Sequence, residues 1–181
     1  NVCSVCLRPS RAACRSKQGT HFVHYKGKVN LNAEQLAVWD FMLDVDKFSA
    51  CMPGVEDLTR VDDATFTGTM KAKVGPISGA FVFEAHIIES EAPTQLKTHV
   101  EGTDSLTNST MTADITMDIA SLDAGGTELT YAASVDLKGR LGIIGDMVIR
   151  ATGAQVIKVF FERMRERIDA ANDKREPEVI R

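Results

Sequence analysis

Long apolar runs and paired cysteines are both missing from this 181-residue sequence. The longest mostly apolar window, residues 141–149, contains Asp146 and is much shorter than the roughly 20 apolar residues of a membrane-spanning helix. Of the four cysteines, only Cys51 lies beyond residue 14, so the sequence offers no disulfide framework. These absences favour a reduced, cytoplasmic protein without a transmembrane segment.

Acidic residues are missing from residues 1–33, which contain six Lys or Arg residues. Because the whole chain has 21 basic and 25 acidic side chains, the remainder is clearly acidic. A nucleic-acid surface needs clustered Lys and Arg, and no basic stripe interleaved with aromatic residues follows Lys28. We therefore exclude nucleic acid as a partner. The hydrophobic share of 44% instead indicates a folded globular domain.

The first 19 residues show no apolar period, and we interpret them as an appendage, either a targeting segment or an artificial extension. Cys3 and Cys6 have the spacing of half a zinc site, and Cys14 follows. A second closely spaced ligand pair at the usual distance is missing, so no metal site is predicted. The single folded domain is expected to cover residues 20–172, and residues 173–181 to form a charged tail containing Pro177.

Apolar periodicity predicts an α+β domain with helices at both ends of a β-rich middle. His21–Leu31 reads as a strand, and Asn32 with Gln35 has the spacing of a capping box for a helix from Ala33. A second short helix, Val45–Cys51, should end before Pro53-Gly54. About six strands and a long amphipathic helix over residues 144–172 complete the order.

Strict alternation along five segments predicts an antiparallel sheet with one apolar and one polar face. Every Asp, Glu and His in these segments falls on the polar parity, as judged from the alternation. A four-residue loop at Glu91–Thr94 would pair Ser90 with Gln95 and place His86 opposite His99 on the polar face. The long helix should cover the apolar face, giving a curved sheet wrapped around it.

Several local motifs resemble the CoxG family of carbon monoxide dehydrogenase subunits, a branch of the START and polyketide-cyclase superfamily. They are Cys51-Met52-Pro53-Gly54, Val74-Gly75-Pro76-Ile77, Gly126-Thr127, and residues 139–145 leading into Phe160-Phe161. The resemblance implies a helix-grip fold. It also implies a small accessory protein of molybdenum-containing carbon monoxide or related dehydrogenases, connected with membrane recruitment and with electron delivery to quinone, and it does not imply catalysis.

Small residues mixed with large ones on the inward face predict an apolar cavity between sheet and helix. Thr98, Tyr131 and Gln155 are the candidates for orienting a carbonyl, such as a quinone oxygen. A plain hydrophobic core is the alternative interpretation for most of the set. The candidate ligand-binding residues are Phe66, Met70, Phe81, Phe83, Thr98, Met111, Met117, Tyr131, Ala133, Met147, Ala151, Gln155 and Phe160.

Glycines at 139, 142 and 145 separate the last strand from the long helix. They predict a flexible corner, or a gate in which Leu141, Ile143 and Ile144 are exposed and contact a membrane or partner.

Two functions remain open at this stage. The first is a non-enzymatic protein that holds a quinone or lipid-like molecule at the inner face of the membrane, without a covalent cofactor and with a dehydrogenase as partner. The second is a cyclase or dehydratase-like enzyme on the same fold. No catalytic residue is predicted, because the acids and histidines of the strands point outward and no nucleophile or phosphate-binding motif occurs.

Overall fold

A computed structural model describes residues 21–173, to which all structural statements refer. The chain forms seven strands, three α-helices and one 3-10 turn. In order these are β1 (His21–Leu31), α1 (Gln35–Leu43), α2 (Val45–Cys51), β2 (Val55–Arg60), β3 (Thr65–Val74), β4 (Ile77–Glu91), β5 (Gln95–Asp104), β6 (Ser109–Ser121), β7 (Thr127–Lys138), η1 (Leu141–Ile143) and α3 (Asp146–Asp173). The predictions for residues 1–19 and for the tail beyond Asp173 lie outside the described residues.

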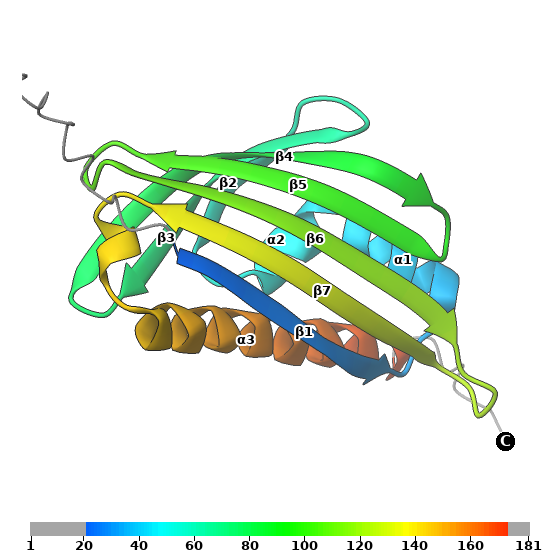
Figure 1. The fold of residues 1–181 in the computed structure, drawn as a ribbon. Coiled ribbons are helices and arrows are strands. Elements are labelled where there is room, and N and C mark those ends of the chain that lie inside the picture. The colour runs from blue at the N-terminus through cyan, green and yellow to red at the C-terminus, as the bar shows by residue number, and fades with distance from the viewer. Residues whose placement is uncertain (1–20, 174–181) are drawn as a thin grey trace, which may run out of the picture.

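The strands form one antiparallel sheet in the order β1-β7-β6-β5-β4-β3-β2, so β1 and β2 are its edges. Figure 1 shows the curved sheet with α3 running along one face and with α1 and α2 on the same side. The predicted α+β helix-grip architecture is therefore confirmed. Within residues 21–173, no helix combines the length and the apolar composition needed to cross a bilayer.

Buried apolar side chains gather in two separate clusters on the helix-covered face. The larger α1 cluster joins α1, α2 and the second half of α3 to the sheet, and it includes Trp39, Cys51, Leu129, Phe160 and Met164. The smaller η1 cluster lies at the other end and contains Val23, Phe81, Leu137, Leu141 and Ile149. The fold is thus packed tightly at its two ends.

The predicted capping box at Asn32 and Gln35 is wrong. Helix α1 begins at Gln35 and its N-cap is Glu34, whose side chain makes no capping hydrogen bond. The Gln35 amide instead donates to the Ile119 carbonyl at 2.6 Å, and its oxygen accepts from the Ser121 hydroxyl at 3.2 Å. A link to β6 therefore replaces the local cap, because the end of β6 lies within reach of the helix.

The β4–β5 hairpin confirms the predicted pairing in its middle and corrects it at its tip. His86 pairs with His99, Ile87 with Thr98 and Ala85 with Val100, as expected. Beyond Ile87 the register shifts by one residue, so that Ser90 pairs with Leu96 and Glu91 with Gln95. A bulge in β4 thus compensates for a loop one residue shorter than predicted.

Candidate ligand-binding site

The middle of the helix-covered sheet face is less tightly packed than its ends. Five apolar residues there belong to neither buried cluster and are only half-buried, although their strands are central. We call them the middle belt: Ala85, Val100, Ile115, Ala133 and Val135. Four of them are direct cross-strand partners, since Ile115 pairs with Ala133 and Ala85 pairs with Val100. Solvent-accessible space therefore remains in front of the belt, between the two clusters.

An open pocket of about 540 Å³ lies between the edge strand β1 and helix α3. Its helical wall is a single stripe at three- and four-residue spacing, from Ala154 to Arg165. Its apolar surface comes from aliphatic and aromatic side chains, and its rim carries several bases. The lining residues are His24, Tyr25, Lys26, Lys28, Val29, Tyr131, Ala154, Ile157, Lys158, Phe161, Glu162 and Arg165.

Strand β1 and helix α3 touch at both ends of this pocket. At one end the Tyr25 hydroxyl donates to the Ile149 carbonyl at 3.0 Å, and the ring lies so close to Gly153 that a Cβ there would be 2.2 Å from the hydroxyl oxygen. Burial raises the pKa of Tyr25, which keeps this donor protonated. At the other end Arg165 donates to the Asn30 carbonyl at 3.5 Å. The pocket is therefore a side opening between two points of contact.

Tyr131 lies at the inner wall of this side opening. Its ring packs against Phe161 with centroids 5.0 Å apart, and it crosses Gly27 on the neighbouring strand. No hydrogen bond from its hydroxyl is found among residues 21–173. The next inward residue along β7 is Ala133, which pairs with the pocket residue Tyr25. The side opening and the middle belt are thus adjacent.

Charges at the rim of the pocket are mostly positive. Lys28 forms an ion pair with Glu128 at 2.8 Å, and Lys158 forms one with Glu162 at 3.7 Å. The Glu128 carboxylate raises the pKa of the Lys28 ammonium by its hydrogen bond. An apolar floor with a polar rim and a single inward hydroxyl suits an amphiphilic ligand.

The predicted ligand-binding residues fall into three groups in the structure. Tyr131 lines the side opening, whereas Phe81 and Phe160 are core residues of the two clusters. The remaining predicted residues on strands are half-buried on the inward face: Phe66, Met70, Phe83, Thr98, Met111, Met117 and Ala133. Met147, Ala151 and Gln155 are exposed, which corrects the helical face predicted for the first half of α3.

This helical face is difficult to predict because the first turns of α3 are apolar on more than one side. The buried or half-buried stripe runs through Ile149, Gly153 and Val156 before it reaches Phe160. Tyr25 sets this phase, since only a glycine at 153 lets its ring approach the helix so closely. The contact joins the first strand to the last helix, and local periodicity carries no information about such a distant pair.

Sequence analysis missed a buried carboxylate at the end of β5. Asp104 is 2% exposed and lies on the inward parity, contrary to the prediction that every strand acid points outward. It accepts from the Thr107 hydroxyl at 2.7 Å and from the amides of Leu106 and Ala80. The Thr107 hydrogen bond is the main cause that lowers the pKa of Asp104. Its alternation position could have identified it, had the strand been followed to its end.

The predicted gate is only partly exposed. Ile143 is 73% exposed as expected, and Ile144 is half-buried. Leu141, in contrast, is fully buried in the η1 cluster, and its amide donates to the Ser109 hydroxyl oxygen at 3.1 Å. This overturns the expectation that Leu141 is exposed. The 3-10 turn is thus anchored to the β5–β6 hairpin through one of the three residues of the predicted gate.

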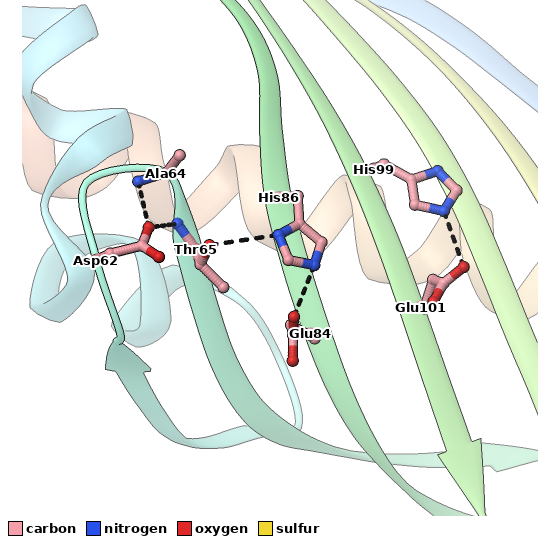
Figure 2. Close-up of polar contacts among 7 residues, drawn as sticks. All are labelled: Asp62, Ala64, Thr65, Glu84, His86, His99 and Glu101. Atoms are coloured by element: carbon pink, nitrogen blue, oxygen red, sulfur yellow. Dashed lines mark hydrogen bonds and ion pairs between the residues drawn. The ribbon is translucent and has the colours of Figure 1, made fainter.

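The opposite face of the sheet carries a row of polar side chains. Figure 2 shows His86 and His99 side by side on the face away from the helices. The imidazole of His86 contacts Glu84 at 2.7 Å and Thr65 at 3.3 Å, while that of His99 contacts Glu101 at 3.4 Å. Asp62 caps the turn before β3 by accepting from the amides of Ala64 and Thr65. Each imidazole is thus paired within the sheet surface.

Potential metal ligands do not converge in the part of the chain that the structure describes. Residues 21–173 contain no group of three or more His, Cys, Asp or Glu side chains placed to hold an ion. Cys51, in the α1 cluster, is fully buried, and burial raises the pKa of its thiol. This cysteine is therefore a core residue in the thiol form.

Comparisons with solved structures define the fold class. A conserved protein from Geobacillus kaustophilus is 19% identical with a TM-score of 0.76, covering 82% of this chain and 97% of that chain. A START superfamily protein from Mycobacterium smegmatis is 13% identical with a TM-score of 0.61, covering 82% and 98%. The Zhui aromatase/cyclase from Streptomyces sp. R1128 is 12% identical with a TM-score of 0.61, covering 82% and 94%. At these identities the likeness establishes the START and cyclase-like helix-grip fold.

The family follows from the sequence itself. Residues 27–169 match the family model of CoxG, a subunit of carbon monoxide dehydrogenase. The chain therefore belongs to the CoxG family, as the motifs around Gly54, Gly126 and Gly139 indicated. The comparison with curated proteins gave no match.

Proposed function

We propose that this protein is a non-enzymatic carrier that holds a hydrophobic small molecule, a quinone or a lipid-like compound, on the helix-covered face of its sheet. The observation that carries this proposal is the separation of the buried core into two clusters with the half-buried middle belt between them. A carrier needs accessible apolar surface, whereas a purely structural core would close over these residues.

The side opening supplies a route to the belt and a polar anchor. Tyr131 points its hydroxyl toward the opening without an internal partner among the described residues, so it is able to donate to a ligand carbonyl. Phe161 offers a flat apolar surface next to it. A quinone combines these two features, because it carries carbonyl oxygens on an apolar ring.

Family membership supports the wider role of the carrier. We infer that it serves a molybdenum-containing carbon monoxide dehydrogenase or a related dehydrogenase as an accessory subunit, on the cytoplasmic side of the membrane. In this role it exchanges its cargo with the bilayer. Two titratable groups on the covered face, Tyr25 and Asp104, are engaged in structural hydrogen bonds, which favours a carrier over a cyclase-like enzyme.

Uptake of a fluorescence-quenching soluble quinone, measured by titration, tests the carrier function. Ala133→Phe should abolish saturable uptake, because the ring would fill the space between Tyr25 and Tyr131. Ala151→Phe is the matched control. It adds the same ring at an exposed position on α3 and should leave uptake unchanged.

Circular dichroism must show that both variants keep the fold. Uptake by Ala133→Phe equal to that of the unmodified protein would remove the proposed site. Turnover of a polyketide substrate that depends on Tyr131 would replace the carrier with an enzyme.

A further inference from the structure

Exposed apolar side chains gather at the end of the molecule that carries η1. Leu106 is 81% exposed, Ile143 73% and Met147 83%, and Val148 is also exposed. They come from the β5–β6 turn, from η1 and from the first turn of α3. We call these four residues the apolar tip. All three segments lie at the left end of the view in Figure 1.

Hydrogen bonds hold the segments of the tip together. Thr107 donates to the Ser109 hydroxyl oxygen at 3.0 Å, and Ser109 in turn accepts from the Leu141 amide. The turn before β4 closes the other side, since a Cβ at Gly75 would lie 3.5 Å from Val148 and 3.6 Å from Ile144. The apolar tip is therefore a fixed feature supported from below by the buried η1 cluster.

Basic side chains surround the apolar tip. Lys73 at the end of β3, Arg140 before η1 and Arg150 in α3 are all exposed. The acids at this end are Asp146 and Asp136, and Asp136 is paired with Lys138 at 3.0 Å. The chain also enters β1 at this end, because His21 pairs with Leu137. The preceding 20 residues contain four further bases and no acid: Arg8, Arg11, Arg15 and Lys17.

We propose that the apolar tip is a docking surface for a bilayer containing anionic phospholipid. The four apolar side chains enter the headgroup region, and the surrounding bases contact the lipid phosphates. Charge complementarity decides between a lipid surface and an apolar protein partner, because the bases lie on the tip itself and on the segment joined to it. This inference rests on the membrane part of the proposed function and assigns it to particular residues.

Co-sedimentation with vesicles tests the assignment. The full chain should bind vesicles made of equal amounts of phosphatidylglycerol and phosphatidylcholine, and it should bind pure phosphatidylcholine vesicles much less. Replacing Leu106, Ile143 and Met147 together by serine should weaken this binding about tenfold or more. The charge variant Arg140→Glu with Arg150→Glu should lose the preference for anionic vesicles.

The control replaces equally exposed apolar residues elsewhere. Leu36→Ser with Val61→Ser changes side chains that are 58% and 61% exposed and should bind vesicles like the unmodified protein. Equal binding by the serine tip variant would overturn the proposal. So would tip-dependent self-association without vesicle binding, which would make the tip a protein interface.

Quinone uptake separates this proposal from the carrier function. The serine tip variant should still take up the soluble quinone, and Ala133→Phe should still bind vesicles. Loss of uptake alone in Ala133→Phe, with vesicle binding independent of the tip, would support the carrier and overturn the docking surface.

Discussion

Tyr131 crosses the edge strand at Gly27, its direct partner in the β1–β7 ladder. A Cβ at Gly27 would lie 2.6 Å from the Tyr131 hydroxyl oxygen and 3.0 Å from the nearest ring Cε1. The missing side chain at position 27 is therefore what allows the tyrosine to reach the side opening. This explains why a glycine is found in the middle of a strand, where it otherwise weakens the sheet.

The first prediction concerns this pair. Gly27→Ala should displace the Tyr131 ring and lower the affinity for a quinone, while the fold persists because the end of a side chain is able to move. Tyr131→Phe should lower the affinity about fivefold, as expected for one hydrogen bond of about 1 kcal/mol. Titration with the soluble quinone measures both effects. Undiminished affinity in both variants would mean that the hydroxyl does not contact the ligand.

How far the sequence predicts this fold depends on the range of the contacts involved. Strand alternation correctly places Ala85 against Val100 and His86 against His99, since period two is a local property. The bulge beyond Ile87 has no local signal, and the predicted pairing of Ser90 is therefore wrong. The two errors in that hairpin cancel, so its middle is predicted correctly although its loop is not.

The candidate site is less predictable than the fold. Tyr131 stands out in the sequence because it is a polar residue on an apolar parity. Phe161 and the side opening have no such signal, since they depend on how α3 rotates against β1. That rotation is fixed by Tyr25 and Gly153, whose contact no spacing in the sequence reveals.

The second prediction explains a motif glycine after α2. Gly54 has φ 82°, and a Cβ there would lie 2.2 Å from the Lys71 carbonyl oxygen. Gly54→Ala should lower the free energy of unfolding by at least about 3 kcal/mol, since backbone cannot move as a side chain does. Gly125→Ala is the control, because Gly125 has φ 89° with open space around it. It should cost only about 1–2 kcal/mol. Urea unfolding compares them, and equal losses would contradict the proposed collision.

The third prediction concerns the anchor of η1. Ser109 is 2% exposed and accepts from the Leu141 amide, so Ser109→Ala leaves a buried donor without its partner. The free energy of unfolding should fall by about 1–3 kcal/mol. Hydrogen exchange at the Leu141 amide should also accelerate. Ser105→Ala, at an exposed position of the same turn, should change neither quantity. Unaltered exchange in Ser109→Ala would show that this hydrogen bond does not hold the turn.

The fourth prediction concerns the pH dependence of stability through His99. The pKa of His99 is raised, chiefly because its Nδ1 bonds to Asp114 at 2.6 Å, with Glu101 adding to the effect and burial opposing it. A native pKa above the unfolded value of about 6.5 means that the folded state holds the proton more strongly. The stabilisation is therefore fully present below about pH 6.5 and is lost as the pH rises through the native pKa.

Asp114→Asn should remove most of this effect. The pKa of His99, followed by NMR of its imidazole protons, should fall toward its ordinary value. The difference in unfolding free energy between acidic and alkaline buffer should shrink by less than about 1 kcal/mol, since the acids are largely exposed. Asp118→Asn is the control: it removes the same charge from the same strand, where Asp118 bonds to Gln95 instead. A midpoint for His99 that is identical in Asp114→Asn and in the unmodified protein would show that Asp114 is not the partner that raises the pKa.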